Sequence, residues 1–378
     1  MTGHLALIAM VAFLGGSAAL CAENAAGLLD IKTDSRILTT VSAGVFPVAV
    51  SINSKTHEVY VPNNSSASVT VIDERSNAPT TVENARGAFS NGVAVNPVTN
   101  KIYVANSQSG NILVIDGATN GRTLVTDPNA GFPVAIAIDA SINKIYVANN
   151  TSNNITVIDG KTNATTTVTD PAAAGPLSIA VNQKTHRVYV ANDASNNFTV
   201  IDGLTHIAMS ITDPNAGCPF AIAVNQVTNK VYGANFCTSN ITVIDGATDT
   251  TKTVVDPNSF NPVGIAVNSV TNKIYVAAQF PANVTVIDGA SDLTSTISNP
   301  LATQPQAIAL DSAANMVYVA NFLSNNVTVI DGATNLVRAT LADPNAKAPY
   351  ALAADLVTHR VYVANSQSGN VSVIAVAR

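Results

Sequence analysis

The sequence predicts an all-β fold, a single β-propeller of eight four-stranded antiparallel blades. Three observations predict it. Tyrosines recur every 43 residues six times and after 44 residues once. Each period holds four short segments rich in β-branched residues, separated by turn residues. A further strand-like segment near the N-terminus supplies the one that the last repeat lacks. A fixed period of about 40–45 residues with strand-like content is typical of propeller blades.

Composition narrows the possible functions. The chain has 378 residues, 47% of them hydrophobic and 11% charged, with a net charge of −6. A disordered chain needs the opposite balance of high charge and low hydrophobicity. The pI of about 5.2 disfavours a nucleic-acid-binding protein, which normally carries a basic patch. We therefore expect a folded protein that binds no nucleic acid.

The first 22 residues are typical of a secretory signal peptide. An apolar stretch, 5–14, is followed by Gly15, Gly16 and further small residues. The stretch is too short for a membrane span. A lipoprotein signal ending at Cys21 is disfavoured by the bulky Leu20, and an uncleaved anchor is the other alternative. We expect a signal peptide at 1–22, a lead-in at 23–35 and the propeller at 36–378. The mature protein would then be periplasmic, extracellular or on the cell surface, and not integral to a membrane.

The third repeat shows the four elements of a blade. Its expected strands are 133–138, 144–149, 154–159 and 165–169. The first three are nearly continuous apolar runs, as expected when both faces of a sheet are covered. The fourth is rich in Thr, as suits an exposed outer edge. Asp-Gly follows the third strand in most repeats and favours a tight turn.

The two ends of the repeat array predict how the ring closes. The eighth repeat stops after its third strand, at 373–376, and the missing fourth strand is found at 36–41. We infer that the first strand of the mature chain completes the last blade. Seven blades remain the alternative if a terminal copy is irregular.

One tetrapeptide gives the repeat a family resemblance. Tyr-Val-Ala-Asn occurs at 103–106, 146–149, 189–192, 318–321 and 362–365, with variants at 60–63, 232–235 and 275–278. Together with Val-Ile-Asp-Gly-Ala-Thr-Asn, it resembles the YVTN family of β-propeller repeats over residues 36–376. The resemblance implies a secreted or surface-associated protein of bacteria or archaea, often a binding protein. The sequence is more distantly similar to propeller lactonases and streptogramin lyases.

Antiparallel strands place the loops on two faces. The loop leading into strand one and the loop joining strands two and three share one end, here called the top face. The other two loops of each blade share the bottom face. Cys218 precedes strand one of the fifth blade and Cys237 follows its strand two, so both thiols fall at the top. An exported protein favours a disulfide between them over two free thiols.

The bottom face carries regularly placed charges. Basic residues stand before or at strand two, and Asp ends strand three in seven blades. These charges pair across the strands, or the Asp side chain caps the turn. His57, His186 and His359 occupy one repeat position on three separate blades, so they cannot converge on a metal.

The top face carries the candidate binding residues. Blades five to seven present Phe236, Phe280, Phe322 and Leu323 where other blades have small or polar residues. Such a cluster forms a partner surface, or it covers the core between blades. A ring of amides near the channel is also expected, to bind a sugar or cation or to satisfy loop backbone. Its members are Asn63, Asn106, Asn149, Asn192, Asn235, Asn321 and Asn365.

No catalytic set is visible in the sequence. We find no Ser–His–Asp set, paired carboxylates or cluster of metal-ligand residues at suitable spacing. We therefore expect a non-catalytic module that binds a protein, glycan or envelope component, with no cofactor and no metal site. The alternative is a lactonase- or lyase-like enzyme with Ca²⁺ or Mg²⁺ at the amide ring. The oligomeric state is not indicated.

Overall fold

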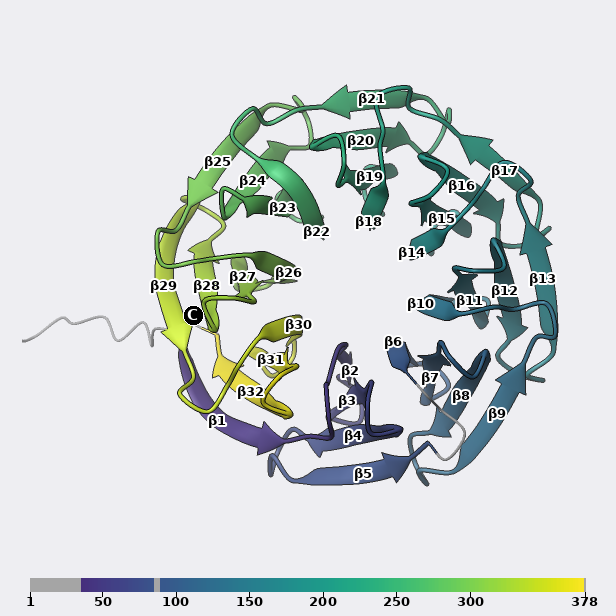
Figure 1. The fold of residues 1–378 in the computed structure, drawn as a ribbon, viewed down its shortest axis with the longest axis horizontal. Helices are drawn as coiled ribbons and strands as arrows, with labels where there is room; N and C mark the ends of the chain where they lie inside the picture. The colour runs from purple at the N-terminus through teal and green to yellow at the C-terminus, as the bar shows by residue number, and fades with distance from the viewer. Residues whose placement is uncertain (1–34, 85–88, 377–378) are drawn as a thin grey trace, which may run out of the picture. The chain divides into compact units, whose positions relative to one another are not determined.

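A computed structural model describes residues 35–84 and 89–376, which contain 32 β-strands in eight four-stranded sheets. Figure 1 shows the sheets arranged as blades around a central axis, as the sequence predicted. The ring has eight blades and not seven. No helix among the described residues is long and apolar enough to cross a membrane. The predicted signal peptide and nearly all of the lead-in lie outside the described residues.

Blades are numbered one to eight along the chain, and each has its first strand innermost (Figure 1). The innermost strands are β2 (Ser51–Asn53), β6 (Ser90–Asn96), β10 (Pro133–Asp139), β14 (Pro176–Asn182), β18 (Pro219–Asn225), β22 (Phe260–Asn268), β26 (Pro305–Asp311) and β30 (Pro349–Asp355). The second strands are β3 (Glu58–Asn63), β7 (Lys101–Asn106), β11 (Lys144–Asn149), β15 (Arg187–Asn192), β19 (Lys230–Asn235), β23 (Lys273–Phe280), β27 (Met316–Asn321) and β31 (Arg360–Asn365).

The third and fourth strands complete the blades outward. The third strands are β4 (Ser68–Asp73), β8 (Asn111–Asp116), β12 (Asn154–Asp159), β16 (Asn197–Asp202), β20 (Asn240–Asp245), β24 (Asn283–Asp288), β28 (Asn326–Asp331) and β32 (Asn370–Ala375). The outermost strands are β5 (Pro79–Glu83), β9 (Arg122–Thr126), β13 (Thr165–Thr169), β17 (Ala208–Ile211), β21 (Thr251–Val254), β25 (Thr294–Ser298), β29 (Leu336–Ala342) and, for blade eight, β1 (Arg36–Ser42).

The N-terminal strand closes the ring. β1 pairs antiparallel with β32, from Arg36 opposite Ala375 to Ser42 opposite Asn370. The outer strand of blade eight thus comes from the other end of the chain, as predicted from the truncated last repeat. Figure 1 shows β1 beside β32, where the two ends of the colour scale meet.

The hydrophobic core lies between blades. Strands two and three are buried on both faces, and the eight repeat tyrosines of strand two are fully buried. In one of eight equivalent clusters, Tyr146 and Val157 of blade three pack with Val188 and Val190 of blade four. Removing such a buried ring costs about 3–5 kcal/mol in comparable cores. Each blade is therefore stabilised mainly by its two neighbours.

A disulfide joins the two ends of the inner hairpin of blade five. Cys218 and Cys237 are bonded, with their Cα atoms 5.3 Å apart. The predicted pairing is confirmed, and with it the assignment of both residues to the top face. By chain entropy, closing a loop of this length contributes about 3 kcal/mol of stability. The bond is consistent with an oxidising, exported environment.

Candidate functional site

The asparagines that end the second strands are buried inside the blades. The exposed fraction is 0% for six of the seven and 1% for Asn365. In blade three, Asn149 Nδ2 donates to Asn154 Oδ1 and to Thr156 Oγ1, each at 2.9 Å. Blades four, five, seven and eight repeat this pair of bonds. The expected ring of amides at the channel is thus a set of internal clamps on the loop after strand two.

The Asp-Pro turns at 127, 170, 213, 256 and 343 each fasten the following blade to the chain that precedes it. Asp127 is buried, and its carboxylate accepts hydrogen bonds from Thr156 Oγ1 at 2.7 Å and Thr167 Oγ1 at 2.9 Å. The backbone N–H of Asn129 donates to the same carboxylate. Asp170, Asp213 and Asp256 do the same in the following blades. These carboxylates are therefore structural acceptors.

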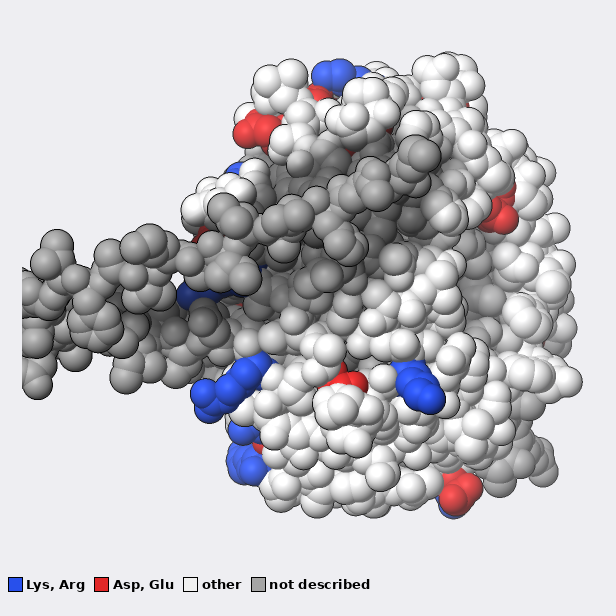
Figure 2. All heavy atoms as spheres, turned by 60° about the vertical axis from the view of Figure 1, so that its left-hand side comes forward, with Lys and Arg blue, Asp and Glu red and all other residues white. Residues whose placement is uncertain are grey.

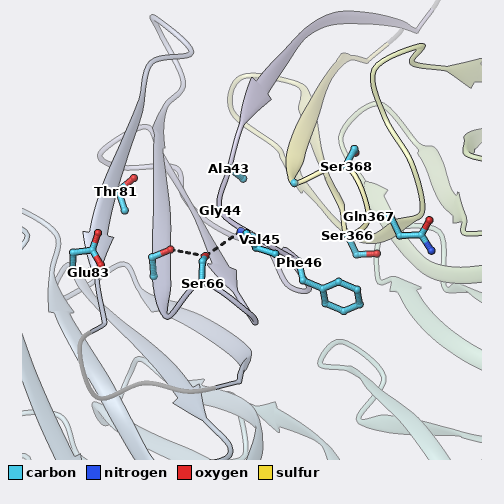
Figure 3. A pocket seen from close by; sticks show the side chains of 12 residues that line it. Ala43, Gly44, Val45, Phe46, Ser66, Thr81, Glu83, Ser366, Gln367 and Ser368 are labelled. Atoms are coloured by element: carbon cyan, nitrogen blue, oxygen red, sulfur yellow. Dashed lines mark hydrogen bonds between the residues drawn. The ribbon is translucent and has the colours of Figure 1, made fainter.

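Where blade eight leads into blade one, this turn is missing and a groove takes its place. Four residues separate Val41 from Phe46, whereas six separate Val125 from the equivalent Phe132. The groove has a volume of about 510 Å³ and opens on the top face. Figure 3 shows Thr81 and Glu83 of β5 on one side and Ser366–Ser368 on the other. Thr81 occupies the repeat position of Thr167, but no Asp-Pro turn reaches it.

The three predicted phenylalanines of blades five to seven differ in exposure. Phe280 is 58% exposed, and it pairs across the strands with Phe260, itself 49% exposed. Phe236 is half-buried, with its ring 5.8 Å from that of Phe220. Phe322 is also half-buried and meets Tyr350 edge-on at 6.2 Å. Leu323, next to it, is 63% exposed. Two of the three rings therefore pack partly against aromatic residues of the innermost strands.

A second set of phenylalanines, on blades one to three, is more regular. Phe46, Phe89 and Phe132 occupy the same repeat position, before the first strand, and are 38–43% exposed. Their φ angles are 61°, 54° and 56°. A bulky side chain rarely adopts this left-handed backbone, which strains it. Phe132 O accepts a hydrogen bond from Asn150 N at 3.0 Å, which holds the position at the top of the blade.

On the bottom face, Asp caps the turn between strands three and four. Asp159 Oδ1 accepts from the backbone N–H groups of Lys161 and Thr162, and Lys144 Nζ lies 2.9 Å from Oδ2. The Lys144 ammonium and these N–H groups hold the pKa of Asp159 well below its usual range. The other six turn aspartates also have a lowered pKa, chiefly through turn hydrogen bonds opposed by partial burial. The expected capping is confirmed.

The basic residues of strand two mostly reach the next blade. Lys101, Lys230 and Lys273 each donate from Nζ to a glycine carbonyl in the following three–four turn, at 2.8 Å. Lys144 with Asp159 is the ion pair within one blade that the sequence had suggested. These long side chains tie adjacent blades together.

A second link between blades joins the end of strand one to the next one–two loop. In five joints it is a hydrogen bond between two asparagines, such as Asn96 Nδ2 to Asn143 Oδ1 at 2.8 Å. In two joints it joins Asp to His: Asp139 to His186 at 2.8 Å and Asp311 to His359 at 2.7 Å. The three histidines are indeed kept apart, as expected, each on its own joint.

The eighth joint, between blades eight and one, brings three ionisable groups together. Ligand atoms of His57, Glu74 and Asp355 all lie within 4.8 Å of one another. Glu74 and Asp355 are each 1% exposed. Burial, and then the neighbouring Asp355 carboxyl group, raise the pKa of Glu74 to about 8. This cluster was missed because its members stand almost 300 positions apart in the sequence. Glu74, which replaces the Gly of the Asp-Gly turn, was the available signal.

Comparisons with known proteins identify the fold of the chain but not its family. No model of a protein family matches the chain, and no curated protein matches its sequence. Hydrazine synthase of Kuenenia stuttgartiensis superposes with a TM-score of 0.62 at 17% identity, covering 89% of this chain and 97% of that one. Virginiamycin B lyase of Staphylococcus aureus also gives 0.62 at 17% identity, covering 76% of this chain and 94% of that one. At this identity the likeness shows a shared β-propeller fold.

Proposed function

We propose that the chain is an exported, non-catalytic β-propeller of the YVTN type that binds a protein, a glycan or another envelope component through its top face. The observation that carries this is the row of exposed rings at Phe46, Phe89 and Phe132. A backbone position that strains a bulky residue is filled three times by a ring that is 38–43% exposed, which favours a binding role over a structural one. Exposed aromatic side chains supply large contact areas in binding surfaces.

The groove beside Phe46 adds to this surface. It combines the Phe46 position with hydroxyl groups of Ser66, Ser68 and Thr81 and the Glu83 carboxylate (Figure 3). Rings next to hydroxyl groups suit a polar ligand that also has apolar faces, such as a sugar or an extended peptide. On the side in view, Figure 2 shows blue and red side chains singly or in small groups among the white residues.

The test replaces the three rings with a residue that suits their backbone. Asn tolerates the left-handed region, and blade six already has Asn261 there, at φ 53°. For Phe46→Asn/Phe89→Asn/Phe132→Asn we expect an unfolding free energy equal to that of the wild type or about 1 kcal/mol higher. Retention on the organism's isolated envelope fraction and on a glycan array should fall about tenfold or more.

Two outcomes would contradict the proposal. If the folded Asn variant is retained as well as the wild type, these rings do not contribute to binding. A loss of several kcal/mol in unfolding free energy would instead show that they cover the core between blades. A companion variant, Phe236→Ala/Phe280→Ala/Phe322→Ala, asks whether blades five to seven also take part. Because Phe236 and Phe322 pack on neighbouring rings, we expect it to lose more stability than the Asn variant.

The lactonase- or lyase-like alternative has weaker support. It needs the strand-two asparagine side chains to face a ligand. These side chains are buried, and their amide nitrogens donate hydrogen bonds within the blades. The similarity to virginiamycin B lyase is limited to the fold.

A further inference from the structure

The joint between blades eight and one departs from its seven counterparts. Elsewhere the last residue of strand one bonds directly to the next blade, as Asp139 does to His186 Nδ1. At the eighth joint the equivalent pair is Asp355 and His57. His57 Nδ1 has no hydrogen-bond partner there, and the nearest carboxylate atom is Glu74 Oε2 at 3.4 Å. A third side chain has entered this joint.

That third side chain stands where the repeat has glycine. Six other blades have Gly at the position of Glu74. A Cβ atom at Gly160 would clash with the Asn143 side chain, and one at Gly203 would clash with the His186 carbonyl oxygen. The position is therefore crowded in the repeat, yet blade one places a complete Glu side chain there, 1% exposed.

Both carboxylate oxygens of Glu74 lack a hydrogen-bond partner in this buried setting. A buried polar atom without a partner is costly, and a buried carboxylate is more so. The two Glu74 oxygens and His57 Nδ1 are thus unsatisfied in a cluster where ligand atoms of His57, Glu74 and Asp355 lie within 4.8 Å of one another. A positively charged occupant would satisfy all of them.

We propose that His57, Glu74 and Asp355 form a binding site for one divalent transition-metal ion, Zn²⁺ foremost, which links blade one to blade eight. Zn²⁺ binds imidazole nitrogens and carboxylate oxygens, and sites with three protein ligands leave a fourth position for water. Tetrahedral bonds of about 2.0–2.1 Å place ligand atoms about 3.3 Å apart, close to the His57–Glu74 separation. Ca²⁺ prefers six to eight oxygen ligands, and this site offers fewer.

The surroundings hold Asp355 in place as a ligand. Ser54 Oγ donates to Asp355 Oδ1 at 2.7 Å, and Thr358 Oγ1 donates to Oδ2 at 2.9 Å. Such supporting bonds orient metal ligands. One positive group is near, since the Arg360 guanidinium donates to the Glu74 carbonyl oxygen. The carboxyl groups of Glu74 and Asp355 share the joint with this single guanidinium group.

The ion would act at the place where the ring is closed. β1, which completes blade eight, is held by strand pairing and not by chain continuity. A metal bridging His57 and Glu74 to Asp355 adds a link between the two end blades. We therefore expect bound Zn²⁺ to raise the thermal stability of the whole propeller.

The test uses the mature, untagged, metal-stripped protein with Zn²⁺ in calorimetry and Co²⁺ in visible absorption. We expect one saturable site per chain, the absorption bands of four-coordinate Co²⁺, and a higher Tm with Zn²⁺. Glu74→Gly and His57→Asn each restore the residue that most other blades use, so both variants should fold. Each should bind Zn²⁺ about 100-fold more weakly, or not at all.

His186→Asn is the matched control, because its joint has Asp and His but Gly203 in place of a third ligand. It should bind Zn²⁺ as the wild type does. The proposal is overturned if the wild type shows no saturable binding at about 100 µM Zn²⁺, or if Glu74→Gly binds equally well. Loss of binding in His186→Asn would place the ion at a different joint.

Discussion

At the joints between blades, one position of the one–two loop has a left-handed backbone and is occupied by either Asn or His. The one–two loop position has φ between 51° and 61° in all eight blades, which favours Asn and disfavours most other residues. Five blades use Asn there and three use His. Each His faces an Asp from the preceding blade. The choice at one position therefore depends on the residue across the joint, because an imidazole N–H needs an acceptor and an amide pairs well with another amide.

This pairing predicts coupling between Asp139 and His186. Asp139→Asn and His186→Asn each disturb a partly buried hydrogen bond of 2.8 Å, so each should lower the unfolding free energy by about 1–2 kcal/mol. The double variant recreates the Asn–Asn joint of five other blades and should recover about 1 kcal/mol or more of the summed loss. Urea denaturation of the four proteins measures the coupling. Additive losses would show that the two joint types are not interchangeable.

At the scale of elements, the hairpin turn between strands three and four is the most uniform unit. Seven turns place an Asp carboxylate on two backbone N–H groups, where it replaces the missing partners of a tight turn. All seven carboxyls have a lowered pKa in the folded chain, for the reasons given above. The turns therefore link folding to proton binding.

The sign of this link follows from the direction of the shift. An acid with a lower pKa in the folded chain adds stability above its unfolded pKa, near 4, and loses it as the pH falls further. We expect the unfolding free energy to fall between pH 4 and pH 2. Asn also caps a turn but does not titrate, so Asp116→Asn/Asp159→Asn/Asp288→Asn should show a shallower fall. Urea denaturation at pH 7, 4 and 3 tests this, and an unchanged slope would mean that other groups control acid unfolding.

At the scale of the whole molecule, the features that could be predicted from the sequence are those that follow from its repeat. A 43-residue repeat places strands, loops and faces in register, so blade number, ring closure and the Cys218–Cys237 bond followed from counting. Burial of the strand-two amides could not be read this way, since it depends on Thr and Asn of the next strand. The tilted contact between the rings of Phe236 and Phe220 could not be predicted from the repeat either. The cluster of His57, Glu74 and Asp355 arises from closure itself, which joins the two ends of the array.

Ring closure also predicts that the chain can begin elsewhere. Arg36 lies opposite Ala375 just as Leu336 lies opposite Asp331, the two ends of an ordinary three–four turn. Joining Val376 to Arg36 through Ala-Thr-Asn, the residues at 333–335, should therefore make β1 a normal outer strand. Opening the chain between Lys161 and Thr162 then leaves β13 as the N-terminal strand that closes blade three.

For this permuted chain we expect an unfolding free energy within about 1 kcal/mol of the 36–376 parent, because one turn cap is lost and one turn is gained. The urea m-value should be unchanged, since the same surface is buried. A permutant that folds with a much lower midpoint would mean that closure through β1 is specially adapted. The cluster of His57, Glu74 and Asp355 at the joint between blades eight and one offers a physical reason for that outcome. Adding Zn²⁺ to the permuted chain and to its parent would distinguish an effect of this cluster from a defect in the new turn.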